Sequence, residues 1–331
     1  MSTLYLTEQG TLLRRQGQRL VIKKGDDTLL DVPIHEIDSV LIFGRVGLTT
    51  PVIDLLLENE IETAFFSLGG KLRGQLTPIK TKNNVLRFEQ FSKCRSETFG
   101  LALARELIDA KIDNAKTVVQ NFRANHPHID LKLQADQLAT FERRCATEEK
   151  IDSLRGIEGI AANTFFSALV KMLPADFGFQ KRQRRPPPDP ANALLSFTYV
   201  LLGNELQALL DGIGFDPYIG FFHSLDYGKP SLALDLLEPL RTAVADRLVL
   251  ALCNLRILKP EDFSIDTNGA RLLPEPRKTY FRHYEKTMNE PVLWQDPYGH
   301  STPRQIMRKT AEEIAAAIQD KRQFVAPRLK T

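Results

Sequence analysis

ETFGLALARELIDAKIDNAKTVVQNFRA, residues 97–124, decides the fold class, because its apolar residues recur every three or four positions. That period predicts a long amphipathic helix. Upstream, YLTEQGTLLRRQGQRLVIKKGDDTLLDVP, residues 5–33, has short apolar runs that are broken at Gly10, Gly17 and Gly25. Such breaks are typical of successive β-hairpins. The sequence therefore predicts a β part followed by a helical part.

The N-terminal part continues with a strand in DSVLIFGR, residues 38–45, and another in TAFFSLGGKLRG, residues 63–74. Between them, TTPVIDLLLENE reads as a helix with Thr50 as N-cap and Pro51 at its first position. A chain of 331 residues exceeds the size at which single cores stop growing, about 250–300 residues. We expect an α+β fold, with a small N-terminal antiparallel β domain and a larger all-helical catalytic domain. These two domains would occupy residues 1–90 and 91–331.

Helical periods dominate the second part. Further helices are expected at about residues 132–148, 153–173, 191–212 and 231–255, with a last one starting at Pro303. Pro239 cannot donate to the carbonyl of residue 235. It therefore opens or kinks the helix there, or it is the first residue of a new helix.

Composition is that of an ordinary folded chain, with 26% charged residues and a net charge of +3. Three widely spaced cysteines, without a CxxC motif, favour a reduced cytoplasmic compartment. We see no signal peptide, and the apolar runs fall short of the ~20 residues of a membrane helix. We therefore expect a cytoplasmic protein without a membrane partner.

GFFHSLDYGKPSLALDLLE, residues 220–238, places His223, Asp235 and Glu238 in otherwise apolar sequence. Asp235 and Glu238 share a face if the segment is helical. Glu158 lies beside alanines on another apolar helix. Carboxylates with one imidazole suit Mg²⁺ or Mn²⁺ better than a structural zinc. The alternative is a set of surface charges or structural ion pairs around a core histidine, and spacing alone favours it.

QKRQRRPPPDP, residues 180–190, carries a dense run of positive charge before a helix. Its basic residues are Lys181, Arg182, Arg184 and Arg185. A looser basic stretch consists of Lys71, Arg73, Lys80, Lys82 and Arg87. Either stretch is a solvated face or a track for nucleic-acid phosphates.

Three blocks together resemble a known family: SLRGIEGIAAN (153–163), RPPPDPANALLSFTYVLL (185–202) and IGFFHSLDYGKPSLALDLLEPLR (219–241). Their order and spacing are similar to those of the CRISPR-associated integrase-endonuclease of the spacer-acquisition module. The resemblance covers essentially the whole chain. It implies a divalent-metal site, Mg²⁺ or Mn²⁺, made by Glu158, His223 and Glu238. Asp235 would be an auxiliary catalytic group, and Asn192 would orient the site or contact DNA.

The resemblance also implies the reaction and the partners. The 3′-hydroxyl of a short DNA fragment would attack a phosphodiester of the CRISPR array, and the same site would cut branched DNA. The expected assembly is a homodimer, formed largely through the β domains, with a small companion protein of the adaptation complex. Lys181, Arg182, Arg184 and Arg185 would follow the phosphates of double-stranded DNA. The competing hypotheses are a non-catalytic DNA-binding scaffold and a generic metal-dependent nuclease or phosphatase.

Overall fold

The computed structural model describes residues 3–68, 72–76, 84–224 and 226–330. Contacts divide the chain into two compact units, residues 1–80 and 81–331. The boundary expected at residue 90 falls later, inside helix α2 (Asn84–Cys94). Of the looser basic stretch, Lys71, Lys80 and Lys82 lie outside the described residues.

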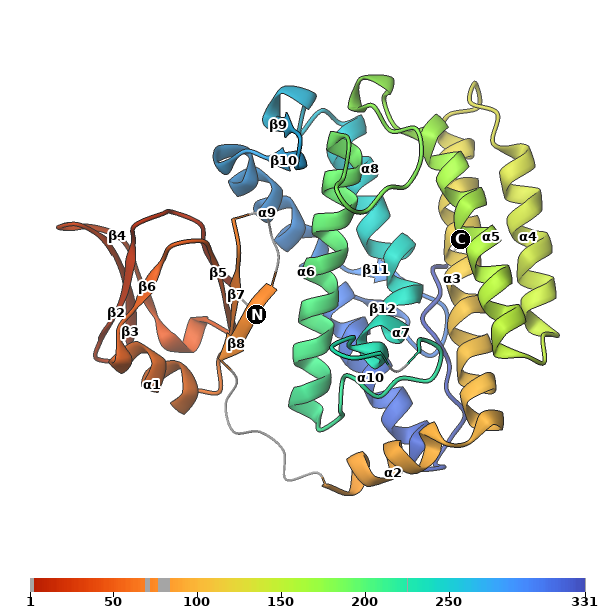
Figure 1. Ribbon diagram of the computed structural model, residues 1–331, viewed down its shortest axis with the longest axis horizontal. Coiled ribbons are helices and arrows are strands. Elements are labelled where there is room, and N and C mark those ends of the chain that lie inside the picture. The colour runs from red at the N-terminus through yellow and green to blue at the C-terminus, as the bar shows by residue number, and fades with distance from the viewer. Residues whose placement is uncertain (1–2, 69–71, 77–83, 225, 331) are drawn as a thin grey trace. The chain divides into compact units, whose positions relative to one another are not determined.

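The N-terminal unit contains two four-stranded sheets and one helix, α1 (Thr50–Glu58) (Figure 1). One sheet has the order β1-β5-β7-β8, with strands Thr3–Leu6, Ser39–Phe43, Glu62–Phe66 and Leu72–Leu76. The other has the order β4-β3-β2-β6, with strands Asp27–Pro33, Arg19–Lys24, Leu12–Gln16 and Gly47–Leu48. A 3₁₀ turn, Ile34–Glu36, follows β4.

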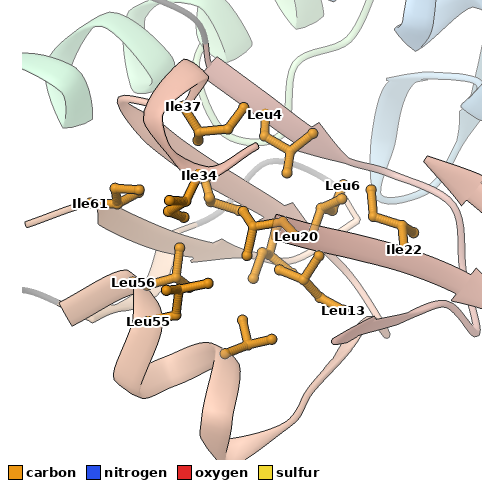
Figure 2. Packing of buried hydrophobic residues seen from close by; sticks show 13 residues of the cluster. Leu4, Leu6, Leu13, Leu20, Ile22, Ile34, Ile37, Leu55, Leu56 and Ile61 are labelled. Carbon is orange, nitrogen blue, oxygen red and sulfur yellow. The ribbon is translucent and has the colours of Figure 1, made fainter. Parts of the chain in front are cut away.

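One apolar core holds this unit together. Figure 2 shows leucines and isoleucines of both sheets pointing toward one another, with Leu55 and Leu56 of α1 packed below them. Leu13, Leu20 and Leu55 are fully buried. Each such side chain contributes about 1.5–3 kcal/mol by leaving water. The alternating apolar residues of the strands and the helically spaced apolar residues of α1 therefore pack into one core.

The α+β class is confirmed, and the β2-β3, β3-β4 and β7-β8 pairs are antiparallel as expected, but both sheets also contain parallel pairs. β1 pairs with β5 in parallel, and β5 pairs with β7 in parallel. Helix α1 lies between β5 and β7 in the chain. It forms the crossover connection that two neighbouring parallel strands need. The N-cap of α1 is Thr49 rather than Thr50, with Pro51 in the first turn.

The C-terminal unit is built on long helices, close to the ranges expected from the sequence (Figure 1). These are α3 (Glu97–Asn125), α4 (Lys132–Ala146), α5 (Ile151–Met172), α6 (Pro190–Ile213), α7 (Ser231–Leu240), α8 (Arg247–Asn254) and α10 (Pro303–Ile318). By length and composition α6 could cross a membrane, but half of its most apolar window is buried inside the protein. A core helix has the same properties.

The C-terminal unit is largely rather than entirely helical. A further helix, α9 (Pro274–Asn289), lies between two short hairpins in the chain. Their strands are β9 (Phe263–Asp266), β10 (Gly269–Leu272), β11 (Val292–Leu293) and β12 (His300–Ser301). The prediction of an all-helical domain was wrong here, because strands of two to four residues leave no readable period.

Pro239 lies inside α7 and does not start a new helix. The chain continues as a π-helical segment, Arg241–Asp246, and then as α8. Segments of this kind are frequent at functional sites. The side-chain amide of Asn114 donates to the carbonyl of Pro239 (2.9 Å) and to that of Pro327 (3.0 Å). The chain end is thereby fastened beside α7, with the Leu329 amide donating to Asn114 (2.7 Å).

Candidate active site

Glu158, His223 and Glu238 come together in the C-terminal unit, although they are far apart in the sequence. Glu158 lies on α5 and Glu238 on α7, while His223 lies on the segment that connects α6 to α7. They line a cavity of about 310 Å³, together with Lys111 of α3. Glu238 is almost fully buried, with 5% of its side chain exposed, against 24% for Glu158 and 22% for His223.

The two glutamates converge on one positive charge. Nζ of Lys111 forms an ion pair with Glu158 and lies 2.6 Å from Oε2 of Glu238. Nε of Arg241 lies 3.1 Å from the same Glu238 oxygen. Burial alone would raise the pKa of Glu238, but Arg241, Lys111 and His223 outweigh it and lower that pKa to about 2. Glu238 is therefore an ionised carboxylate held by two cations.

Asp235 takes no part in that cluster of charges. Its Oδ2 accepts from the backbone amides of Phe221 (2.6 Å) and Phe222 (3.0 Å). Its Oδ1 accepts from the amide of His223 (2.9 Å) and lies 2.7 Å from Nδ1 of that ring. An ionised carboxylate can only accept, so Nδ1 carries the proton that faces Asp235, and Nε2 is the nitrogen left to face Glu238. Asp235 therefore fixes the backbone, the orientation and the tautomer of His223.

Neighbouring residues fix the same segment from other sides. Arg155, one turn before Glu158, donates to the carbonyl of Phe222 (2.6 Å). The amide group of the buried Gln90 donates to the carbonyls of Asp216 (2.9 Å) and Ile219 (2.7 Å). Gly220 lets the chain approach α7, because a Cβ there would lie 2.6 Å from Oδ2 of Asp235.

With Nε2 of His223 facing Glu238 Oε1 at 3.6 Å, the set of possible metal ligands comprises two carboxylates and one imidazole nitrogen. Hard divalent cations such as Mg²⁺ and Mn²⁺ take such ligands. Among the described residues, however, no three His, Cys, Asp or Glu side chains are placed to hold a metal ion as they stand. The residue types and their convergence fit a cation, and the charge that the carboxylates hold here is the ammonium of Lys111.

The cavity is also lined by a further buried carboxyl group, that of Asp246. It accepts a hydrogen bond from the hydroxyl of Tyr199, whose ring lies under the guanidinium of Arg241 at 4.9 Å. Burial raises the pKa of Asp246 to about 6, despite the hydrogen bonds from Tyr199 and Thr242. Asp246 thus differs from Glu238 in that its side-chain hydrogen bonds come from hydroxyl groups, with Arg182 and Arg241 acting on it only through their charge.

The dense basic run lies before α6, and its members differ in exposure. Lys181, Arg184 and Arg185 are exposed, and Arg184 also lines the cavity. Arg182 is turned inward, where it donates to Oδ1 of Asn192 (2.9 Å) and lies over the ring of Tyr199.

Asn192 is fully buried and orders this basic run. Its Oδ1 accepts from the amide of Gln183 (2.8 Å), and its Nδ2 donates to the carbonyl of Lys181 (2.9 Å) and to Asp189 (2.7 Å). These bonds, with the one from Arg182, occupy the whole side-chain amide. Asn192 therefore orients the backbone of the basic run.

Sequence reasoning missed Lys111, Arg241 and Arg155. Arg241 follows Glu238 by three residues, so the helical spacing of an ion pair was a usable signal. Lys111 gave no local signal, because it precedes Glu158 by 47 residues and interrupts an apolar helix as many surface lysines do.

Comparison with known proteins places the chain in a family. The family model described as CRISPR associated protein Cas1 matches residues 4–286. The curated "CRISPR-associated endonuclease Cas1 3" of Thermus thermophilus is 34% identical over 294 residues, which cover 88% of this chain and 86% of that protein.

Two solved structures share the fold. A casposase bound to an integration product aligns over 98% of this chain and 93% of its own, with a TM-score of 0.86 and 24% identity. A chain of a Cas6-RT-Cas1–Cas2 complex aligns over 97% of this chain and 35% of its own, with a TM-score of 0.82 and 25% identity. The resemblance carried by the three sequence blocks is confirmed. The chain belongs to the Cas1 family of CRISPR-associated endonucleases, the integrases of CRISPR adaptation.

Proposed function

We propose that Glu158, His223 and Glu238 hold a divalent cation, Mg²⁺ or Mn²⁺, at which this chain performs strand transfer and cleavage of DNA. The observation that carries the proposal is the meeting of two carboxylates from α5 and α7 around one positive charge, with Nε2 of His223 beside them. A bound ion of this kind polarises a phosphoryl oxygen and stabilises the charge that develops during displacement.

The chain's own residues then have separate roles. Glu158 and Glu238 supply the negative charge, and Asp235 holds His223 with Nε2 directed at Glu238. The attacking hydroxyl belongs to a DNA end in strand transfer and to water in hydrolysis, so no Ser or Cys nucleophile is required. The protein's remaining contribution to the rate is to position the phosphodiester in the cavity.

DNA would reach the cavity along the exposed Lys181, Arg184 and Arg185, with Arg184 at the cavity wall. Phosphate contacts of this type are salt-dependent and carry little sequence information. Replacing Arg185 by alanine should weaken binding to duplexes of different sequence alike and reduce the salt slope by about 1. Measuring affinity for two unrelated duplexes across a salt series tests this role.

Family membership supports a division of labour between the two parts of the chain. We assign catalysis to residues 91–331, and to residues 1–90 the contact that forms a homodimer. A small companion protein of the adaptation complex completes the assembly, and one of the similar solved chains belongs to a Cas6-RT-Cas1–Cas2 complex. Three free cysteines, two of them buried, are compatible with work in a reducing cytoplasm.

The test uses end-labelled branched DNA with Mn²⁺ or with EDTA, and compares wild type, His223→Ala and His128→Ala. His128 is an exposed histidine of the same unit and serves as the matched control. We expect cleavage in wild type and His128→Ala only with metal, and its loss in folded His223→Ala.

A structural ion-pair cluster in a DNA-binding scaffold would present the same Lys111 contacts. In that case no lane would show cleavage, EDTA would change nothing, and DNA binding would persist. A generic nuclease would instead cut unstructured DNA as well as branched DNA and would give no strand-transfer product.

A further inference from the structure

Lys111 stands where the two proposed metal-binding carboxylates meet. Its side chain is 13% exposed, and its Nζ contacts Glu158 on one side and Oε2 of Glu238 on the other. A metal ion bound by both glutamates would have to come within a few ångströms of this ammonium. The two cations therefore compete for the same oxygens.

The charges around these oxygens already balance. Glu158 and Glu238 contribute two negative charges, and Lys111 and Arg241 contribute two positive ones. Adding a divalent ion would leave two excess positive charges in a largely buried place. Repulsion between like charges is strong where water is excluded. Metal binding therefore requires that one internal cation leave or that new negative charge arrive.

Of the two internal cations, Lys111 is the one free to leave. Arg241 is packed on the ring of Tyr199 at 4.9 Å as well as paired with Glu238. The ion pairs of Lys111 within the described part of the chain are those with the two glutamates. Lysine also carries its charge on a flexible four-carbon stem. Its ammonium can thus swing from the carboxylates toward the open cavity.

We propose that Lys111 is an internal substitute for the metal, which competes with the divalent ion in the free protein and turns to a DNA phosphate when both are bound. The DNA phosphodiester supplies negative charge that offsets the excess positive charge brought by the metal ion. Metal and DNA therefore bind cooperatively, each weakly without the other. This inference rests on the metal site proposed above and assigns Lys111 a positioning role there.

The experiment is a titration of Mn²⁺, with free Mn²⁺ measured by electron paramagnetic resonance, on wild type, Lys111→Met, Lys116→Met and His223→Ala. Lys116 is the matched control, because it lies on the same helix and bridges two carboxylates, Asp113 and Glu142, away from the cavity. Without DNA, Lys111→Met should bind Mn²⁺ at least about tenfold more tightly than wild type, a coupling of ordinary size. Lys116→Met should match wild type.

A second arm repeats the titration with branched DNA at 4 °C, and electrophoresis of the recovered DNA checks that it has stayed uncut. DNA should tighten Mn²⁺ binding to wild type and should do so much less in Lys111→Met. Mn²⁺ should also raise the melting temperature of Lys111→Met more than that of wild type, because the unpaired glutamates gain most from the ion. Lys111→Gln provides the same comparison if the methionine variant does not fold.

Two failures are distinguishable. Equal or weaker Mn²⁺ binding in the Lys111 variants, with binding that still depends on His223, would overturn the role of Lys111 and leave the metal site intact. Absence of Mn²⁺ binding in every variant, with or without DNA, would overturn the metal site and this inference together.

Discussion

Asp235 and Glu238 lie one turn apart on α7, and both are buried, but the regions around them are built differently. Asp235 accepts from three backbone amides and from the ring of His223. Glu238 faces the side-chain cations Lys111 and Arg241 instead. Backbone donors cannot leave without unfolding the segment, whereas a lysine can be exchanged for another cation. One carboxylate therefore builds the site, and the other is available for chemistry.

The largest effect should follow Glu238→Gln, which keeps the size of the side chain and removes its charge. We expect cleavage of branched DNA to fall by about three orders of magnitude, since transition-state charge loses its stabilisation. Lys111 retains Glu158 as a partner, so circular dichroism should show a folded protein. Near-normal cleavage by this variant would mean that Glu238 is a structural ion-pair residue.

Asp235→Asn should act on stability first. An amide can accept with only one oxygen, so at least one buried N–H loses its acceptor, at a cost of about 2–4 kcal/mol in the free energy of unfolding. Mn²⁺ affinity should fall roughly 10–100-fold through disorder of His223. Denaturant unfolding and Mn²⁺ titration measure the two effects.

Asp226→Asn is the control for that variant, because Asp226 lies in the same segment with 62% of its side chain exposed. Little change is expected there. Should Asp235→Asn be as stable as wild type, the distinction between the two acids of α7 would be lost.

Asp246 extends the comparison to a buried carboxyl group with hydroxyl partners. Its folded-state pKa of about 6 lies above its ordinary value of 3.8. Its contribution to stability is therefore complete below pH 4 and is lost as the pH rises through 6. The difference in unfolding free energy, wild type minus Asp246→Asn, should fall by roughly 2.5 kcal/mol between pH 4 and pH 7.5.

Urea unfolding at both pH values measures this difference. Asp152→Asn serves as the control, since the Asp152 side chain is 92% exposed, and its difference from wild type should not vary with pH. A pH-independent difference for Asp246→Asn would show that Asp246 titrates normally.

The smallest effect is expected from Gly220→Ala, which pushes the His223 segment away from Asp235. The new Cβ would meet Oδ2 at 2.6 Å and backbone of Ser231 at 2.7 Å. Overpacking of this kind costs about 1–3 kcal/mol. Gly156→Ala, on an open face of α5, should be neutral or gain up to about 1 kcal/mol. Equal melting temperatures for the two variants would contradict the close approach.

Periodicity was enough to predict the order of the two parts and most long helices, because apolar spacing follows directly from burial. It could not predict the parallel pairing of β1, β5 and β7, which depends on where α1 returns the chain. The short hairpins and α9 were also missed.

The site shows the same limit. Residue types indicated carboxylate and imidazole chemistry, and the family resemblance selected Glu158, His223 and Glu238. Spacing alone did not do so, because the three residues lie on separate elements. The neutralising charge was invisible, since Lys111 meets Glu158 only through the packing of α3 against α5.

The π-helical segment Arg241–Asp246 sets the angular phase between α7 and α8. A turn closed by i→i+5 hydrogen bonds takes up one residue more than an α-helical turn, so deleting one residue there would restore ordinary α-helical winding and leave the later side chains of α8 near their present facing. The wholly buried Leu252 and Cys253 would keep facing the core. The π-helical turn can therefore take up the loss of a single codon, and alignments of related sequences should allow a one-residue gap at 241–246 without a rotation of α8.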